Sequence, residues 1–223
     1  MTLAGADVIM HSGGEESKGS YLATSIQPHS PRFEKWIEAR HTFMLERGWV
    51  TGPEDDFDGY DLDQQTEHLG VYEGDQLVYG MRLTPVDGFE QSLSWNMVEN
   101  SSIQQQIQEK ALLNSTHQVW DLTRLVPGEA ASIRASYSAI PKLFGEGLRH
   151  CIAEGDENPL WIFVLDEGMK KWLLRQGVDI TILGEGQVNG DTVNSSFGYF
   201  EPAKLAALQD VHPFAKQAMA SED

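Results

Sequence analysis

The stretch SIRASYSAIPKLFGEGLRHCIAEGDENPLWIFVL, residues 132–165, joins a long helical pattern to a continuous apolar run. Ser132 is a candidate N-terminal cap, and Pro141 is expected to disturb the helix locally. The run LWIFVL, Leu160–Leu165, is typical of a strand buried on both faces. Because HQVWDLTRLV, residues 117–126, also has a strand pattern, this part of the chain predicts a strand–helix–strand unit.

The flanking segments extend this unit in both directions. Residues 33–44 carry apolar side chains at helical spacing, and EHLGVYEGDQLVYGMRLTP, residues 67–85, predicts two strands joined by a turn at EGDQ. The remaining expected elements are broken helix over 93–113, a helix over 166–177, strands over 179–183 and 195–201, and a helix over 202–210. This order predicts an α/β (α+β) fold, with a central mixed sheet and helices on both faces.

Composition excludes several classes of protein. The 223 residues carry a formal net charge of −18, which argues against bulk affinity for nucleic acid or anionic membranes. The single cysteine, Cys151, rules out an internal disulfide framework and is typical of a reducing compartment. LWIFVL is the longest apolar run and is too short to span a bilayer, and the N-terminus has no signal-peptide pattern. We therefore expect a cytoplasmic protein.

The two ends of the chain differ in composition from its middle. Residues 1–31 contain GGEESKGS and predict a mobile N-terminal extension. Residues 32–210 predict a single domain, and residues 211–223 predict a C-terminal tail.

The stretch EDDFDGYDLD, Glu54–Asp63, places six carboxylates in ten residues without a Lys or Arg. It matches an EF-hand calcium loop at positions 1, 3, 5 and 6 only superficially, because position 12 is Gln65 and a strand pattern follows. The seven histidines show no paired spacing for zinc. We expect no metal site. From composition alone, a solvated acidic loop is the simplest interpretation.

Two arginines lie within otherwise apolar strand patterns, Arg82 in VYGMRLTP and Arg124 in VWDLTRLV. Arginine does not lose its charge, so each must reach water or a carboxylate. One interpretation is an ordinary Arg–Asp pair that braces a loop against the sheet. The other is a polar cleft with fixed cations and carboxylates, suited to a ligand that carries both an amine and a carboxylate.

Four motifs follow one another along the chain: an Arg and a Phe ahead of Gly-Trp, then DFDGYD, then GMRLTP, then WDLTR. In this order and at these separations they resemble the acyl-homoserine-lactone synthases, the bacterial quorum-sensing autoinducer synthases. The resemblance runs from about Phe33 to Tyr199. It implies an acyltransferase with a GNAT-like fold.

The resemblance also implies substrates and a reaction. The amine of S-adenosylmethionine would attack an acyl thioester carried on acyl carrier protein or coenzyme A. The carboxylate of S-adenosylmethionine would then close a lactone ring and release methylthioadenosine. S-adenosylmethionine is a substrate in this scheme, and no prosthetic group is implied.

Carried over by position, the resemblance implies two sets of site residues. The implied catalytic residues are Asp56, Asp58, Asp61, Arg82, Asp121 and Arg124. The implied substrate-binding residues are Arg40, Phe43, Trp49, Thr123 and Phe163.

The chain departs from the family pattern at several of these positions. Asp56 and Asp121 stand where the family usually has Glu, and Thr123 replaces Ser. Arg40 lies three residues before Phe43, where the family has four. Phe163 lacks the hydroxyl that accompanies 3-oxo chains in the family, which favours an unsubstituted acyl chain; core filling explains Phe163 equally well.

The helix pattern DEGMKKWLLRQG carries a basic cluster of Lys170, Lys171 and Arg175. It matches in position the basic helix on which relatives dock the acidic acyl carrier protein. A solvated helix face near the C-terminal end of the helix dipole is the alternative.

Two other functions stay open at this point. One is a GNAT-like N-acyltransferase that does not form a lactone. The other is a catalytically silent relative that binds an acyl or S-adenosylmethionine-like ligand, with the two Glu-to-Asp changes as marks of decay.

Overall fold

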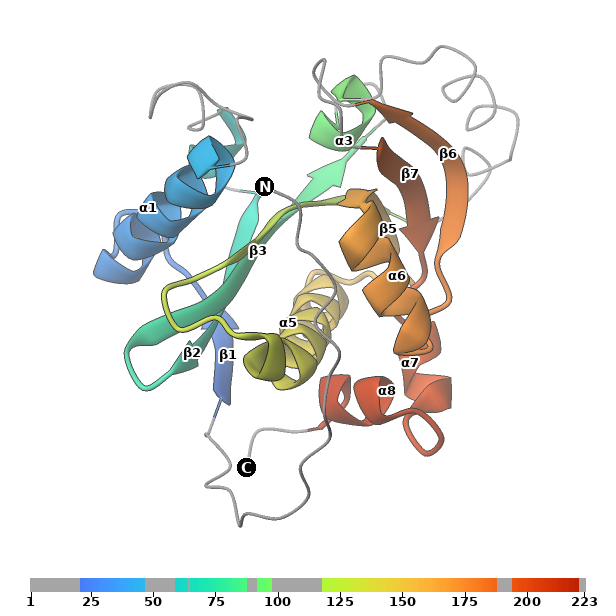
Figure 1. Ribbon diagram of the computed structural model, residues 1–223. Coiled ribbons are helices and arrows are strands. Elements are labelled where there is room, and N and C mark those ends of the chain that lie inside the picture. The colour runs from blue at the N-terminus through green and yellow to red at the C-terminus, as the bar shows by residue number, and fades with distance from the viewer. Residues whose placement is uncertain are drawn as a thin grey trace.

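A seven-stranded sheet organises the chain in the order β1-β2-β3-β4-β5-β7-β6 (Figure 1). The computed structural model describes residues 21–46, 59–63, 65–87, 92–97, 118–187 and 194–220. The strands are β1 (Tyr21–Ser25), β2 (Glu67–Glu73), β3 (Gln76–Val86), β4 (Val119–Pro127), β5 (Leu160–Asp166), β6 (Thr181–Gln187) and β7 (Asn194–Phe200). Neighbouring strands are antiparallel except β4 and β5, whose connection passes through a long helix.

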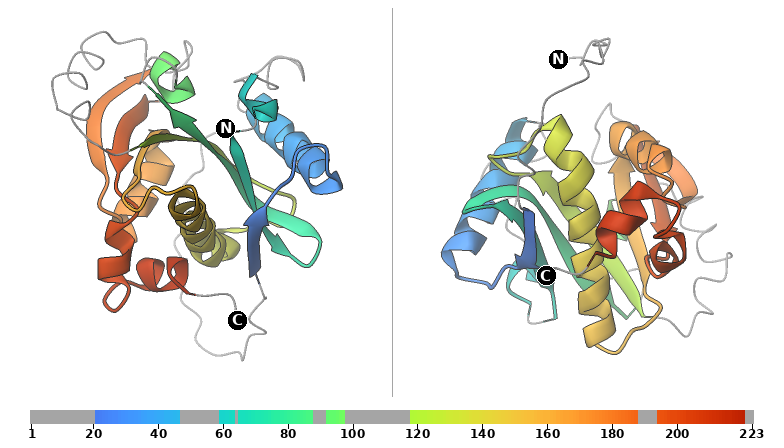
Figure 2. Two further views of the ribbon diagram at one scale, coloured as in Figure 1. Left: turned by 180° about the vertical axis from the view of Figure 1, so that it is seen from behind. Right: turned by 90° about the horizontal axis from the view of Figure 1, so that it is seen from below.

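Helices lie on both faces of this sheet, as the sequence predicts. They are α1 (Pro31–Glu46), the 3-10 turn η1 (Gly59–Leu62), α3 (Leu93–Asn96), α5 (Ile133–Ala153), α6 (Glu167–Arg175), α7 (Lys204–Leu208) and α8 (Pro213–Ala218). Viewed from below, α1 and α5 lie on opposite sides of β1–β3 (Figure 2). The predicted mixed α/β fold is confirmed.

The β2–β3 hairpin begins at a tight turn and changes register partway along its length. Gly74 and Asp75 form the turn, and Gly74 has φ of 60°, a left-handed conformation that favours glycine. The pairing shifts by one residue between Val71 and Tyr72, and this irregularity places His68 directly opposite Arg82 on β3. This register later determines which side chains meet at the site.

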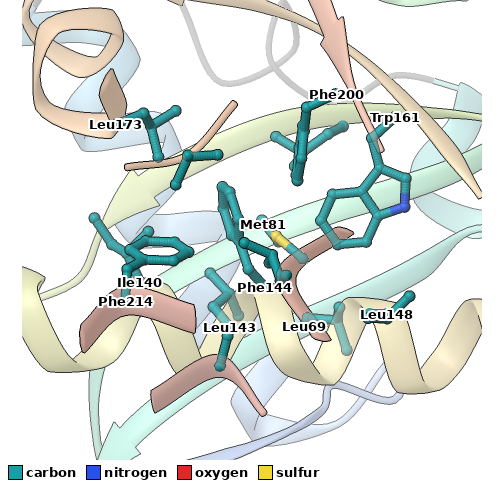
Figure 3. Packing of buried hydrophobic residues seen from close by; sticks show 14 of the residues in the cluster. Leu69, Met81, Ile140, Leu143, Phe144, Leu148, Trp161, Leu173, Phe200 and Phe214 are labelled. Atoms are coloured by element: carbon teal, nitrogen blue, oxygen red, sulfur yellow. The ribbon is translucent and has the colours of Figure 1, made fainter. Parts of the chain in front are cut away.

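The main hydrophobic core lies between the sheet and α5 (Figure 3). Phe144 of α5 contacts the rings of Trp161 on β5 and Phe200 on β7, with centroids 5.7 and 5.5 Å apart. Ser132 caps α5 by accepting a hydrogen bond from the Ala135 amide at 3.0 Å, as expected. The helix continues through Pro141, which is buried.

Both predicted chain-end segments need correction. Tyr21–Ser25, expected within a mobile extension over 1–31, forms β1 and pairs antiparallel with β2, with Leu22 opposite Tyr72. Residues 211–223, expected to be a tail, include α8, whose Phe214 is 2% exposed and packs against Phe144. In both segments, short apolar stretches stand among polar residues, which led to the prediction of mobile ends. These stretches are stabilised by burial against α5.

The parallel pairing between β4 and β5 is short. It joins Val119–Leu122 to Leu160–Phe163 and ends there, although β4 runs to Pro127 and β5 to Asp166. Arg124, just beyond the paired segment, has φ of 56°, which interrupts the strand's regular alternation. The two strands therefore separate at the end of their pairing.

None of the helices in the described ranges is long and apolar enough to cross a membrane.

Candidate active site

Two arginines and one aspartate form a buried cluster on the α1 side of the sheet. Arg40 Nη1 and Nη2 donate to Asp61 Oδ1 and Oδ2 at 2.6 and 2.9 Å. Arg82 Nη1 donates to Asp61 Oδ1 at 3.0 Å. All three residues have zero exposure. Because both carboxylate oxygens of Asp61 accept hydrogen bonds from guanidinium groups, this carboxylate holds the arginines rather than serving as a free base.

Separate elements supply each member of the cluster. Arg40 lies on the buried side of α1, where its guanidinium sits 4.8 Å from the centre of the Trp36 ring. Arg82 lies in β3, and its Nε donates to Thr123 Oγ1 on β4 at 3.1 Å. Asp61 comes from η1. Helix, turn and two strands must therefore all be in place before the cluster forms.

Arg40 reaches this cluster although its spacing from Phe43 differs from the family pattern. The helical periodicity places Phe33, Trp36, Arg40 and Met44 on the buried side of α1. The side chain that faces the sheet is therefore at position 40, and Ala39 is not needed for this contact.

His68, which the sequence analysis did not single out, adjoins the cluster. It is 1% exposed, and its Nε2 lies 3.0 Å from the Asp61 carbonyl oxygen, which accepts the hydrogen bond from the Nε2–H tautomer. Burial lowers the pKa of His68 to about 4, with the nearby positive charges of Arg82 and Arg40 acting in the same direction. No sequence signal identifies it, because counting back from the Gly74–Asp75 turn pairs residue 68 with Met81, and only the register shift between Val71 and Tyr72 places it opposite Arg82.

Asp121 is the second buried carboxyl group of the site. Its Oδ2 accepts a hydrogen bond from the Ser94 backbone amide of α3 at 3.1 Å, and Oδ1 has no hydrogen-bond partner within the described part of the chain. Burial raises the pKa of Asp121, although the Ser94 hydrogen bonds and the Arg82 charge oppose this effect. This carboxyl group therefore retains more affinity for a proton than an ordinary aspartate.

A cavity of about 470 Å³ occupies the region where β4 and β5 separate. Its polar wall includes Ser94, Thr123 and Arg124, whereas most of its lining is apolar. The apolar lining includes Phe43, Leu93, Met97, Leu122, Leu125, Val164, Leu165 and Met169. Thr123 and Ser94 connect this cavity to the arginine cluster and to Asp121, because they bind Arg82 and Asp121 respectively.

The structure brings together many of the predicted site residues. Arg40, Asp61, Arg82 and Thr123 form one hydrogen-bonded cluster, while Phe43 and Arg124 line the adjoining cavity. Asp56, Asp58 and Trp49 lie outside the described residues.

Phe163, predicted to bind substrate, is placed elsewhere. It is 1% exposed, packs in the core beside Phe200 with centroids 6.2 Å apart, and is not part of the cavity lining. Phe163 is the last β5 residue paired with β4 and fills the core, whereas Val164 and Leu165, just beyond the pairing, line the cavity. This placement agrees with the core-filling interpretation of Phe163.

The basic cluster on α6 divides in the structure. Lys170 is predicted from the sequence to help dock the carrier. It is 9% exposed and pairs with Glu185 at 2.7 Å and Glu167 at 2.5 Å, so it is not available for that contact. Lys171 and Arg175 are exposed, and the pair that Lys171 forms with Glu167 at 3.3 Å lies at the surface. Sequence spacing alone does not predict that Glu185 on β6 pairs with Lys170.

Within the part of the chain that the structure describes, no group of three or more histidine, cysteine, aspartate or glutamate side chains could hold a metal ion.

No protein-family profile matches the sequence, and no curated protein sequence matches it either. Solved structures do match. FeeM, an N-acyl amino acid synthase from uncultured soil microbes, superposes with a TM-score of 0.61 at 12% identity, over 88% of this chain and 97% of FeeM. TofI, in a complex with an inhibitor and MTA, superposes with a TM-score of 0.57 at 17% identity, over 87% of this chain and 98% of TofI. BjaI, a CoA-dependent acyl-homoserine lactone synthase solved with MTA, superposes with a TM-score of 0.57 at 17% identity, over 91% of this chain and 92% of BjaI.

The chain has the fold of the acyl-homoserine-lactone synthases. The same α/β fold extends to GNAT-like acyltransferases, as the sequence resemblance implied. At these identities the likeness shows the fold alone.

We expect the buried neutral His68 to make stability depend on pH. In the unfolded chain the imidazole protonates near pH 6.5, whereas in the folded protein it stays neutral until about pH 4. The unfolded state therefore binds more protons as the pH falls through this window, and the free energy of unfolding decreases by about 2–3 kcal/mol between pH 7 and pH 4.5.

Urea denaturation of the wild type and of His68→Gln at both pH values measures this effect, because the other titrating groups are common to the two proteins. The wild type should lose about 2–3 kcal/mol more than the variant. Equal losses would contradict the assignment of a buried neutral histidine.

Proposed function

We propose that the protein is an N-acyltransferase of the acyl-homoserine-lactone synthase type. It transfers an acyl group from a thioester to the amine of S-adenosylmethionine and then closes the lactone for quorum-sensing signal production. The observation that carries the proposal is the buried Arg40–Asp61–Arg82 cluster, joined through Thr123 to an apolar cavity between β4 and β5. Thr123 and Arg124 give the cavity wall a polar part next to the cluster, and most of the remaining lining is apolar.

The cavity fits the acyl part of the thioester. Its lining is mostly aliphatic and includes Leu122, Leu125, Val164 and Leu165 from the two separating strands. Burial of a methylene group against such a lining stabilises binding by about 0.8 kcal/mol.

The polar part of the cavity wall fits an amine that also carries a carboxylate. Arg124 lies on the cavity wall, and Thr123 beside it already accepts a hydrogen bond from Arg82. A guanidinium group binds a carboxylate with two parallel hydrogen bonds and so fixes its orientation. Held in this way, the carboxylate of S-adenosylmethionine is kept near its own γ-carbon, which favours ring closure over attack by water.

Two bond exchanges complete the reaction. In the first, the neutral amine attacks the thioester carbonyl; the nitrogen–carbon bond forms, the carbon–sulfur bond breaks and the carrier thiol leaves with a proton. In the second, a carboxylate oxygen of the acylated S-adenosylmethionine attacks the γ-carbon, and the sulfonium sulfur leaves as methylthioadenosine. S-adenosylmethionine is therefore consumed as a substrate.

Asp121 is the described carboxyl group best suited to accept the proton of the attacking ammonium. It lies behind Ser94 on the cavity wall, and its Oδ1 has no hydrogen-bond partner among the described residues. Its raised pKa brings it toward the range in which a general base works efficiently near neutral pH. Asp61, with both oxygens engaged by guanidinium groups, is suited to positioning instead.

A second candidate function is N-acyl transfer to another amine without lactonisation. The likeness to FeeM, an N-acyl amino acid synthase, favours it. Asp56 and Asp121, where the synthases usually have Glu, favour instead the third candidate, a silent ligand-binding relative. The same assay separates all three.

The assay incubates the protein with S-adenosylmethionine and a panel of acyl-carrier-protein and acyl-CoA thioesters. We expect an acyl-homoserine lactone and methylthioadenosine in equal amounts, detected by mass spectrometry. Acyl transfer to S-adenosylmethionine or to free amino acids without methylthioadenosine would support the second candidate. Ligand binding without turnover on any thioester would support the third.

Asp121→Asn should lower kcat by about 10²–10³-fold, because the amide cannot accept the ammonium proton. The amide oxygen still accepts the Ser94 hydrogen bond, so thermal unfolding should change little and KM should stay within about threefold. Steady-state kinetics with the thioester that the panel identifies measures both constants. A kcat within a factor of three of the wild type would exclude Asp121 as the base.

Acyl carrier protein is the proposed donor, and Lys171 and Arg175 are its proposed contacts. Both are exposed on α6, the helix whose Met169 lines the cavity. Ile133, which is 84% exposed at the start of α5, lines the same cavity and marks an apolar opening nearby. A basic surface beside an apolar entrance suits an acidic carrier that delivers a chain.

Lys171→Glu should raise KM about tenfold for an acyl-carrier-protein substrate and much less for the matching acyl-CoA, because the reversed charge repels the acidic carrier. Lys216→Glu on α8 makes the same charge change at another exposed lysine and serves as the control. Initial rates with both donors provide the comparison. Equal effects on the two donors, or an equal effect of the control, would exclude α6 as the docking surface.

A further inference from the structure

His68 adjoins all three members of the Arg40–Asp61–Arg82 cluster through its hydrogen bond, its strand pairing and its ring packing. Its Nε2–H donates to the Asp61 carbonyl oxygen at 3.0 Å, which joins the backbone of η1 to strand β2. It lies directly opposite Arg82 in the β2–β3 register. Its ring centre is 4.8 Å from that of Trp36, the same indole on which the Arg40 guanidinium rests.

The packing around His68 fixes its ring in place. Phe33 meets the ring edge-on with centroids 5.1 Å apart, at an interplanar angle of 69°. Trp36 contacts it at 53°, and the residue is 1% exposed. Because the ring is fixed by this packing, its Nε2–H points at the Asp61 carbonyl oxygen.

The position requires a donor without charge. A protonated imidazole would add a positive charge beside Arg40 and Arg82, and its Nδ1–H would have no acceptor, since Nδ1 is buried without a hydrogen-bond partner among the described residues. The neutral Nε2–H tautomer avoids both costs. Lysine or arginine could not replace this donor for the same reason.

We infer that His68 is a positioning residue that holds η1 against the sheet and so places the Asp61 carboxylate between the guanidinium groups of Arg40 and Arg82. For its effect on catalysis the inference rests on the proposed function; the geometric part does not. Loss of the bond would let η1 and Asp61 shift, so the guanidinium groups and the Thr123 contact beside the cavity would lose their fixed geometry. The acyl acceptor, rather than the acyl donor, should then bind more weakly.

Three variants separate the hydrogen bond from the packing. His68→Phe keeps an aromatic ring against Trp36 and removes the N–H. His68→Gln removes the ring and restores an uncharged N–H donor at similar reach. Tyr72→Phe is the matched control, because Tyr72 belongs to the same buried cluster as Phe33 and Trp36, and its hydroxyl has no hydrogen-bond partner in the described part of the chain.

The first measurement needs no substrate. In protein labelled with ¹⁵N-arginine, we expect a slowly exchanging Nε–H signal from Arg82, because this group donates to Thr123 at a fully buried position. Its exchange with solvent should accelerate by about tenfold or more in His68→Phe and return to within about threefold in His68→Gln. Tyr72→Phe should match the wild type.

The second measurement uses the acyl-transfer assay. His68→Phe should raise KM for the acyl acceptor by about tenfold and leave KM for the donor within about twofold, with partial recovery in His68→Gln. A variant that merely destabilised the fold would lower the active fraction and change kcat without this separation of the two KM values.

Unchanged Arg82 exchange in His68→Phe would overturn the inference, and so would a His68→Gln variant no better than His68→Phe. If His68→Phe does not fold, the ¹⁵N spectrum of the wild-type histidines decides, because the inference requires the Nε2–H tautomer of His68 at pH 7. The opposite tautomer would overturn it. A wild type with the expected exchange and tautomer but no acyl transfer would refute the proposed function and leave the positioning role intact.

Discussion

The burial of Arg82 in the middle of a strand is the constraint on which the site depends. Arginine keeps its charge, and removing one partner of a buried ion pair costs about 3–5 kcal/mol. The compensating carboxylate of Asp61 lies 21 residues earlier in the chain, and the second guanidinium, from Arg40, another 21 residues before that. The polar cluster therefore requires α1, η1, β3 and β4 to be correctly placed together, which links the correct fold to the geometry of the site.

The two faces of the sheet have different roles. On the α5 side, aromatic residues such as Phe144 and Trp161 fill a core that supplies hydrophobic stabilisation. On the α1 side, polar groups replace part of that core and carry specific hydrogen bonds instead. The separation of β4 and β5 opens the sheet between these two regions. The stable core thus holds the strands whose separation creates the cavity.

The differences between expectation and structure have particular causes. Phe163 lies within the paired part of β5 and Val164 and Leu165 lie beyond it, and the sequence alone did not tell where the pairing with β4 ends. Lys170 pairs with Glu185 on β6, a contact between residues 15 apart that helix spacing does not predict. Asp121 belongs to the predicted set, but only the structure shows that its carboxylate joins β4 to α3. His68 was missed because a histidine in a strand pattern carries no signal without its neighbours.

The sequence by itself determined the order of the elements from α1 to α7 apart from η1, the β2–β3 turn and the residue types of the cluster, because helical periodicity, strand alternation and turn glycines act over a few residues. Only the tertiary structure decided that Arg40 shares Asp61 with Arg82, that β1 and α8 complete the domain, and that β4 and β5 separate. These features depend on contacts between distant segments. Local pattern cannot fix them, because the free energy that selects them comes from burial and charge pairing in the assembled fold.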